Sequence, residues 1–446
     1  MNPDAGDGRQ GEGTEIDHNA ERAGHGGTLR ETGGTVNDRP HLSTCFHLAR
    51  PGTLRECAIA EAHVRPGWDV VWLSDIAWGS LWQRPQQLAT RFPDDTRILF
   101  VEPWTLGHQP AFRATRVTDR ISRVSFPFLP LHARSLGLRR FAYRWGSSGV
   151  GVGTLLAIQR AWAGTLRGFY RSGAKRLALI QNFMAYPTLR SWRPDRIVYD
   201  MIDAPLHFAP VPPRLVPYWK SLLASADRVV VTSSPLATLA SEGGATRVSL
   251  VGNGVETERF ARAQARPESL PGAPGVPALG YVGSIHAWFD VPLVRALALG
   301  IPNAKVVLVG PAHPATQREL ERAAAETPNL HWMGALPYTE IPSIVGSFRV
   351  GLIPFRRTPL TEAVNPVKLY EYAAAGVPCV TTRFSDEVDR WAPAARVADG
   401  PEEFLRESRA LLAATPDRTT LRAFAALHDW DAIARHFAAI CLEGSA

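Results

Sequence analysis

Cysteine is scarce in this sequence, and the cysteines that occur form no recognisable pattern. Among 446 residues there are four, with neither a Cys-x-x-Cys pair nor a His-Cys cluster: Cys45, Cys57, Cys379 and Cys441. Isolated thiols argue against a disulfide framework and against a structural zinc site, and they fit a reducing compartment. Because no other metal-ligand cluster is visible, we expect no metal ion and no other cofactor.

Long hydrophobic runs are also lacking. No stretch reaches the ~18 apolar residues of a transmembrane helix, and the N-terminus lacks the apolar core of a secretory signal. Residues 1–40 have too few large apolar side chains to offset the entropy of ordering the chain, and we expect a disordered leader over residues 1–60. We expect the protein to be cytoplasmic or peripheral on the inner face of the plasma membrane.

Acidic residues are almost absent between residues 113 and 176, where 13 Lys or Arg occur with a single acid, Asp119. Five aromatic residues lie among these charges: Phe141, Tyr143, Trp145, Trp162 and Tyr170. A basic surface with aromatic rings attracts an anionic lipid leaflet, so an anionic membrane is one expected partner. A solvated basic face is the alternative. We expect no nucleic acid, because no nucleic-acid-binding motif accompanies the charges.

The apolar runs of the chain form two series with helical segments between the runs. The first comprises residues 68–73, 97–101, 177–180, 196–199, 228–231 and 248–251, and the second 278–283, 305–309, 349–355 and 379–382. Such runs are typical of buried parallel strands. We therefore predict an α/β fold with two Rossmann-like domains, 66–265 and 275–420, and a C-terminal helical part, 421–446. One helix is expected over about 418–442, with Leu427 among its apolar positions.

A short helix with both ends marked is predicted between the last two strands. Asn365 suits the N-cap, and Pro366 suits the first helical position, where its missing N–H costs nothing. Gly376 suits the left-handed residue after the helix, and Pro378 prevents continuation. The N-terminus of this helix points at the carboxyl edge of a parallel sheet, where ligands of such folds bind.

Two polar residues occupy useful positions on this helix. Lys368 lies in the first turn beside free backbone N–H groups, which suits a phosphate. Glu371 lies one turn deeper on the same face, where a carboxylate suits the hydroxyls of a ribose. An ordinary exposed ion pair between the two residues explains the spacing equally well.

The same segment resembles the nucleotide-binding signature of bacterial GT-B glycosyltransferases (group 1, family-4-like, of the surface polysaccharide type). The pattern Pro-x-Lys-x-x-Glu-Tyr-x-Ala-x-Gly-x-Pro is filled at every fixed position, from Pro366 to Pro378. The resemblance implies two Rossmann-like domains facing across a cleft, with the C-terminal helix crossing back to the first domain. It also implies a nucleoside-diphosphate sugar as donor, bound by Pro366, Lys368, Leu369 and Glu371.

Two further segments are similar to the same enzymes. Residues 226–260 resemble the segment that closes their first domain, and Asn253-Gly254 within it predicts a tight turn with positive φ. A Trp-x-x-x-x-Gln-Arg-Pro stretch begins at Trp78, directly after the first strand. Its loop is expected to open onto the cleft and to offer contacts to the acceptor or the diphosphate: Gly79, Ser80, Gln83 and Arg84. Arg84 is alternatively a residue of a helix surface.

Two acids, Asp200 and Asp203, follow another strand of the first domain, with His207 close behind. Carboxylates at the carboxyl end of a strand are candidates for a general base or for sugar contacts. Both are therefore candidate catalytic residues, together with Lys368, which would stabilise the departing diphosphate. As an alternative, Asp203 caps the helix that follows.

The sequence departs from the family pattern at the diphosphate. Gly283 and Ser284 follow the first strand of the second domain, and the resemblance implies that their backbone N–H groups face the diphosphate. Relatives place an Arg and a Lys shortly after this glycine, whereas none follows closely here. We expect Lys368 to supply the charge, with Arg356 and Arg357 next.

A second departure concerns the acid expected to touch the donor sugar. Relatives space two glutamates with seven residues between them, and Ala363 stands where the first is due. Glu362, one place earlier, serves if the loop has one extra residue; otherwise Asn365 contacts the sugar. The identity of the donor and the retaining outcome therefore stay open.

We predict a glycosyltransferase that moves a sugar from a nucleoside-diphosphate sugar to a lipid-linked or polysaccharide acceptor in cell-surface glycan synthesis, with retention as the expected outcome. Two other functions stay open. One is a sugar-nucleotide epimerase or hydrolase of the same fold, and the other is a non-catalytic scaffold that binds sugar nucleotides or glycans.

Overall fold

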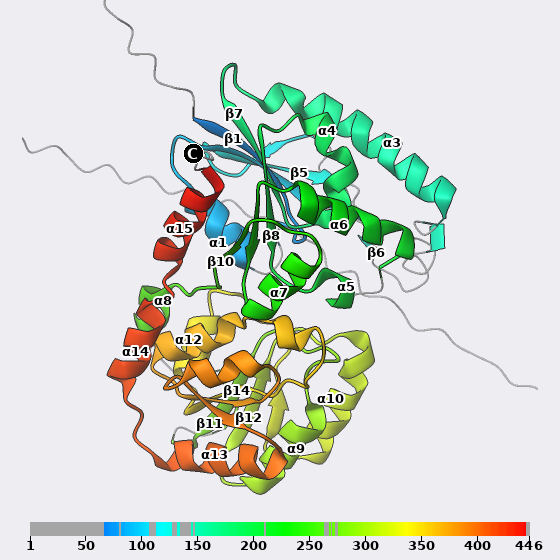
Figure 1. The fold of residues 1–446 in the computed structure, drawn as a ribbon. Coiled ribbons are helices and arrows are strands. Elements are labelled where there is room, and N and C mark those ends of the chain that lie inside the picture. The colour runs from blue at the N-terminus through cyan, green and yellow to red at the C-terminus, as the bar shows by residue number, and fades with distance from the viewer. Residues whose placement is uncertain are drawn as a thin grey trace, which may run out of the picture. The chain divides into compact units, whose positions relative to one another are not determined.

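The computed structural model describes residues 67–79, 82–106, 113–126, 132–133, 144–145, 148–208, 211–262, 267–268, 270–272 and 275–442. The predicted leader, residues 1–60, lies outside these ranges, as do Ser80, Phe141 and Tyr143. Two large sheets, each with helices on both faces, belong to one compact unit (Figure 1). The predicted domain boundaries stay a prediction.

The first large sheet has the strand order β10-β9-β8-β7-β1-β2-β5-β4, in which only the edge strand β4 is antiparallel. Its strands are β1 (Trp68–Leu73), β2 (Arg97–Pro103), β4 (Thr115–Arg116), β5 (Ile121–Phe126), β7 (Lys175–Ile180), β8 (Arg196–Met201), β9 (Arg228–Val231) and β10 (Val248–Leu250). The strands in its middle are apolar along nearly their whole length because helices cover both faces. A separate short pair joins β3 (Thr105–Leu106) to β6 (His132–Ala133).

The described helices of this half lie between and after these strands. They are α1 (Arg84–Thr90), α3 (Gly149–Thr165), α4 (Leu189–Trp192), α5 (Pro205–Phe208), α6 (Val216–Ser225), α7 (Ser234–Glu242) and α8 (Thr257–Arg262). Three 3-10 turns accompany them: η1 (Leu166–Phe169), η2 (Phe183–Thr188) and η3 (Pro213–Leu215). No helix among the described residues is long and apolar enough to cross a membrane.

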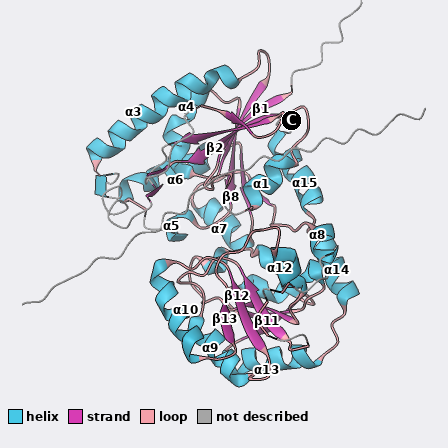
Figure 2. Ribbon diagram, turned by 180° about the vertical axis from the view of Figure 1, so that it is seen from behind, coloured by secondary structure: helices cyan, strands magenta, loops and turns pink. Residues whose placement is uncertain are grey.

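The second large sheet has the order β13-β12-β11-β14-β15-β16, and all its pairings are parallel. Its strands are β11 (Ala278–Val282), β12 (Lys305–Val309), β13 (Leu330–Trp332), β14 (Val350–Ile353), β15 (Cys379–Thr382) and β16 (Ala395–Ala398). Helices α9 (Val291–Gly300), α10 (Pro314–Glu326), α11 (Ile341–Gly346), α12 (Val367–Ala375) and α13 (Pro401–Ala413) flank it, with turns η4 (Thr361–Ala363) and η5 (Asp386–Trp391). Seen from behind, the strands of this sheet lie between these helices (Figure 2).

The C-terminal part consists of two helices, so the single helix predicted over 418–442 is wrong. Helix α14 (Arg418–Ala426) packs on α12, and α15 (Trp430–Leu442) packs on α1. Between them the chain pairs with another segment, because the Val255 N–H donates to the His428 carbonyl oxygen at 2.9 Å and the Trp430 N–H donates to the Val255 carbonyl oxygen at 3.1 Å. Leu427, predicted as an apolar contact, lies at this break and is 78% exposed.

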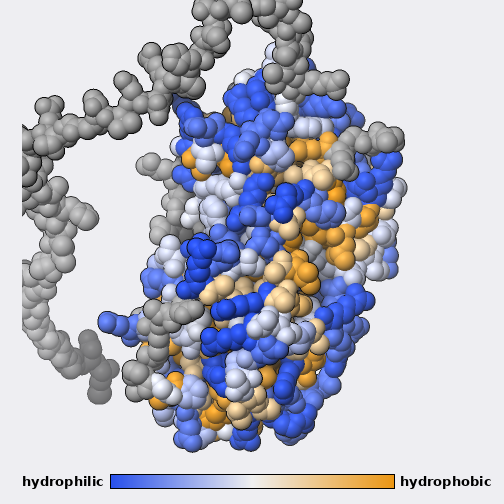
Figure 3. Space-filling view, turned by 90° about the vertical axis from the view of Figure 1, so that its left-hand side faces the viewer, coloured by the Kyte–Doolittle hydropathy of each residue, from blue (hydrophilic) through white to orange (hydrophobic). Residues whose placement is uncertain are grey.

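Helix α15 returns to the first sheet. Its Phe437 ring lies 6.2 Å from Trp72 of β1 and 6.1 Å from Phe92 after α1, and the three rings are buried. Hydrophilic and hydrophobic residues mix on the face over which the C-terminal helices run (Figure 3). The apolar side of α15 therefore packs on the first half, whereas α14 packs on the second.

One local prediction for the first half is wrong. Neither Asn253 nor Gly254 has a positive φ; the glycine is needed because an added Cβ would lie 2.6 Å from the His428 carbonyl oxygen. The described aromatic residues of the basic region, Trp145, Trp162 and Tyr170, are partly buried against the hydrophobic core of the first half. The predicted membrane contact of this region stays a prediction.

Candidate active site

The carboxyl ends of the two large sheets line one cavity of about 1320 Å³. The segments after β1, β7 and β8 form its first wall, and those after β11, β12 and β14, with the start of α12, form its second. Ligands of parallel α/β sheets bind at this edge. The cavity is therefore the candidate active site.

Helix α12 begins one residue later than predicted. Pro366 is its N-cap, with φ −79° and ψ 117°, so neither the predicted cap role of Asn365 nor the first-turn position of Pro366 is correct. The Asn365 side chain is held elsewhere: its Oδ1 accepts from the Asn253 N–H at 2.9 Å, and its Nδ2 donates to the Tyr370 hydroxyl at 2.9 Å. Gly376, with φ +73°, ends the helix as predicted.

Lys368 lies against the backbone of Gly283 in the second wall. With φ +142°, Gly283 has a conformation that favours glycine, and an added Cβ would lie 3.1 Å from Lys368 Cε. Lys368 Nζ is 4.8 Å from the centre of the Phe355 ring and 5.2 Å from that of Tyr281. Burial lowers the Lys368 pKa to about 8, and the negative charge of Glu371 opposes this shift. The structure thus brings two predicted diphosphate contacts together.

Glu371 lines the same wall and is 8% exposed. It forms no ion pair with Lys368, so the alternative of an exposed ion pair is wrong. Burial raises the Glu371 pKa to about 7, while Lys368 lowers it. This buried carboxylate has no hydrogen-bond partner among the described residues, so it is suited to accept hydrogen bonds from the hydroxyl groups of a ligand.

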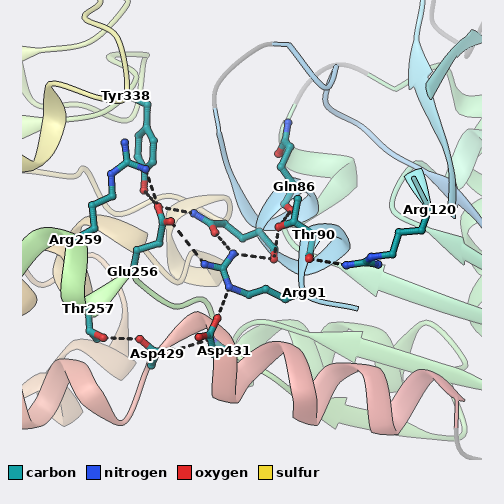
Figure 4. Close-up of polar contacts among 11 residues, drawn as sticks. Gln86, Thr90, Arg91, Arg120, Glu256, Thr257, Arg259, Tyr338, Asp429 and Asp431 are labelled. Carbon is teal, nitrogen blue, oxygen red and sulfur yellow. Dashed lines mark hydrogen bonds and ion pairs between the residues drawn. The ribbon is translucent and has the colours of Figure 1, made fainter. Parts of the chain in front are cut away.

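Glu256 connects α1 with the second wall (Figure 4). Its Oε2 accepts from the Tyr338 hydroxyl at 3.1 Å and from Gln87 Nε2 at 3.2 Å. Arg259 pairs with the same carboxylate at 3.2 Å, and Arg91 pairs with it at 3.6 Å. Because Gln87 and Arg91 belong to α1 and Tyr338 lines the cavity, this network fixes one half against the other beside the site.

Arg84, which lines the cavity as predicted, forms a buried ion pair with Asp200 behind it. Arg84, the first residue of α1, binds Asp200 through Nε at 3.1 Å and NH2 at 3.0 Å, and the side chains are 3% and 0% exposed. Arg84 NH1 also donates to the Gly252 carbonyl oxygen at 2.8 Å, and Gln181 Nε2 donates to Asp200 at 2.8 Å. The helix-surface alternative for Arg84 is therefore wrong. Asp200, predicted as catalytic, does not line the cavity, and both its oxygens accept hydrogen bonds from Arg84 and Gln181.

Asp203, the other predicted catalytic acid, lines the cavity. It has no hydrogen-bond or ion-pair partner among the described residues, so the cap alternative also fails. The sequence analysis missed Asp75, which follows β1 and lines the same wall. The signal that selected Asp203, an acid at the carboxyl end of a strand, applies equally to Asp75.

The remaining predicted contacts divide between the cavity and other places. Gly79, Gln83, Ser284, Asn365 and Pro366 line it, and Gln83 also caps α1 in a capping box with Gln86. Ser80 lies outside the described residues.

Three residues predicted at the donor do not line the cavity. Arg356 pairs with Asp290 at 3.8 Å, and Glu362 pairs with Arg357 at 2.7 Å. Leu369 is fully buried in the hydrophobic core of the second half. The idea that one extra loop residue brings Glu362 to the sugar is therefore not supported, and Asn365 is the candidate that the structure leaves.

Comparison with known proteins identifies the class. Residues 276–414 match the family model described as Glycosyl transferases group 1. The chain is 27% identical over 290 residues to TuaH of Bacillus subtilis (strain 168), a proposed teichuronic acid biosynthesis glycosyltransferase, covering 59% of this chain and 71% of that protein. This chain is a glycosyltransferase with a group 1 domain. The predicted family and enzyme class are confirmed.

The fold of this glycosyltransferase is GT-B, as predicted. The structure of Anabaena HepE in complex with UDP and glucose superposes with a TM-score of 0.58 at 14% identity, covering 83% of this chain and 98% of that one. WaaG, a glycosyltransferase involved in lipopolysaccharide biosynthesis, gives a TM-score of 0.55 at 14% identity and covers 84% and 100%.

The glycosyltransferase has an aromatic stack where relatives place cations. His286 lies parallel to Trp288, with ring centres 4.4 Å apart and planes at 6°, and its ring is 4.9 Å from His313. Burial and His313 lower the His286 pKa to about 4, so the imidazole is neutral at pH 7. Arg356 also contacts this loop, because its N–H donates to the Trp288 carbonyl oxygen at 2.7 Å, but it does not line the cavity. The cavity-lining cation beside Gly283 is Lys368.

Nucleotide affinity should depend on pH through Glu371 and Lys368. As the pH falls through about 7, Glu371 gains a proton and loses its ability to accept two hydrogen bonds; as the pH rises through about 8, Lys368 loses its charge. We expect the tightest binding of a nucleoside diphosphate between these limits. Calorimetry from pH 5.5 to about 9.5 would test this, and Glu371→Gln should abolish only the loss at low pH. An affinity independent of pH would contradict the prediction that Glu371 and Lys368 contact the nucleotide.

Proposed function

We propose that this glycosyltransferase moves a sugar from a nucleoside-diphosphate sugar to a lipid-linked or polysaccharide acceptor in cell-surface glycan synthesis. We further propose that the anomeric configuration is retained and that no divalent ion takes part. The single observation that carries the proposal is the placement of Lys368, Gly283 and Glu371 in one cavity wall at the start of α12.

The donor side of the proposal follows from charge. When the bond between the sugar and the diphosphate breaks, negative charge grows on the diphosphate oxygens. The Lys368 ammonium, the free N–H groups at the start of α12 and the Gly283 backbone supply positive charge in that wall. Glu371, one turn after Lys368 on α12, would accept hydrogen bonds from the ribose hydroxyls. These groups supply the stabilisation that a divalent ion would otherwise give.

The acceptor side of the proposal follows from the first wall. Apolar side chains dominate it, and they suit an acceptor with an apolar part: Ile76, Trp78, Phe183, Met184, Ile202 and Val211. TuaH, named for teichuronic acid biosynthesis, supports a cell-surface glycan as product. The positive charges of the exposed residues Arg144, Arg160 and Arg167 support contact with an anionic membrane.

Nucleotide release from a panel of UDP-, GDP- and dTDP-sugars, with and without a membrane lipid extract, tests the proposed function. Wild type, Glu371→Ala and the control Glu402→Ala, an exposed acid of α13, would be run together. We expect release of one nucleotide that depends on the extract and is lost only in Glu371→Ala. Release without any acceptor would favour an epimerase or hydrolase, and binding without release under every condition would favour a scaffold.

A further inference from the structure

Three polar residues follow three neighbouring strands in the first wall. Asp75 follows β1, Asn182 follows β7 and Asp203 follows β8, and β7 pairs with both of the others. The Asn182 N–H donates to the Leu73 carbonyl oxygen, two residues before Asp75, at 3.2 Å. Because adjacent strands lie about 4.8 Å apart, Asp75 and Asn182 lie next to each other, and in the register Asp203 lies two residues beyond their level. We refer to these three residues, with the amide on the middle strand, as the row. All three line the cavity.

The amide of this row has an unused donor. Asn182 is 4% exposed, and its Oδ1 accepts from the Met184 N–H at 3.0 Å. Its Nδ2 has no hydrogen-bond partner among the described residues, although the side chain lines the cavity. This nitrogen is not among the fully buried side-chain atoms that lack a partner, so it is open to the cavity, where it can donate to an oxygen that a ligand supplies.

The two acids of the row are unpaired as well. Neither Asp75 nor Asp203 has a hydrogen-bond or ion-pair partner among the described residues, whereas their neighbour Asp200 is fully bound by Arg84 and Gln181. Asp203 is half-buried, whereas Asp75 is exposed, and both side chains lie in the wall of the cavity. The surrounding protein reduces solvation there: it raises the Asp75 pKa to about 7, with repulsion from Asp203 and Asp200 adding to it, and it raises the Asp203 pKa to about 6. Near pH 7 the pair can therefore both hold and accept protons.

We propose that Asp75, Asn182 and Asp203 bind the hydroxyl of the acceptor and that the carboxylate pair receives its proton. This inference rests on the proposed function. Asn182 Nδ2 donates to the hydroxyl oxygen, and an ionised carboxylate of the pair accepts the hydroxyl proton. As the proposed retention requires, the oxygen forms its new bond to the anomeric carbon on the face from which the diphosphate leaves. The bond from that carbon to the diphosphate oxygen breaks at the same time, and the electron pair of this bond leaves with the diphosphate.

The experiment compares transfer with donor binding in Asp75→Asn, Asp203→Asn, the double variant and Asn182→Ala. The matched control is Asp94→Asn, an exposed acid of the same half. Transfer would be followed with the donor and lipid extract that the wild type uses, and donor binding by calorimetry with the matching nucleoside diphosphate. We expect each Asp variant to lower kcat for transfer by about 10²–10⁴ without changing nucleotide affinity.

The double variant should be about as slow as the slower single variant, because the two acids act as one unit. Asn182→Ala should mainly raise KM for the acceptor. Unchanged transfer in both Asp variants would overturn the inference, and so would a parallel loss of nucleotide affinity, which would place the row at the donor. If the wild type itself transfers no sugar, the proposed function fails first, and that outcome is distinct from a defect confined to these variants.

Discussion

Lys368→Ala is expected to lower kcat for sugar transfer by about 10²–10³, because it removes the positive charge that lies beside Gly283 in the wall proposed to hold the diphosphate. The effect should fall on kcat more than on donor KM, since the charge of the diphosphate grows as the bond breaks. Steady-state kinetics with the preferred donor would measure it.

Lys220→Ala is the matched control for this prediction. Lys220 is an exposed lysine of α6 that does not line the cavity, so its removal changes the net charge equally without touching the site. We expect wild-type kinetics for it. If Lys368→Ala kept more than a tenth of wild-type kcat, the proposed role of Lys368 in stabilising the departing diphosphate would be excluded.

Arg84→Ala is expected to destabilise the first half by about 3–5 kcal/mol, because it leaves the Asp200 carboxylate buried without its charged partner. It also removes the donor to the Gly252 carbonyl oxygen, which joins α1 to the segment after β10. The loss of stability should be visible as a lower midpoint of thermal or denaturant-induced unfolding. Buried ion pairs are costly to break even where they contribute little net stability as a pair.

Two further variants separate this explanation from simple loss of packing. Adding Asp200→Asn to Arg84→Ala should recover part of the stability, since a neutral amide is less costly to bury than an unpaired charge. Arg116→Ala, which breaks an exposed pair with Asp119, should leave the unfolding midpoint unchanged. Equal destabilisation by Arg84→Ala with and without Asp200→Asn would show that the charge is not the cause.

Much of the fold was predictable because its strands are continuous apolar runs. The predicted runs 228–231, 305–309 and 379–382 coincide with β9, β12 and β15. The strands that the analysis missed, β13 and β16 among them, contain His331 and Arg396 and lie at or next to the sheet edge, where a side chain can reach water. Such strands lack the run of apolar residues on which the prediction depends.

The candidate site was predictable only where one helix carries it. The positions of Lys368 and Glu371 follow from the period of α12, and both line the cavity. The partner of Asp200 lies 116 residues away in sequence, and no local pattern indicates that Arg84 reaches it. The prediction of Asn365 as the N-cap was wrong for a similar reason. Its side chain accepts from the Asn253 N–H, a tertiary partner that helix-capping preferences do not include.

Calorimetric titration of UDP, GDP and dTDP into wild type and Glu371→Gln tests the central claim most directly. The claim is that the wall formed by Gly283, Lys368 and Glu371 is the nucleotide site. We expect one nucleotide to bind the wild type, and to bind Glu371→Gln at least about tenfold more weakly, since charged hydrogen bonds to the ribose are lost. Equal affinity in the two proteins, or no binding of any nucleotide, would contradict the claim.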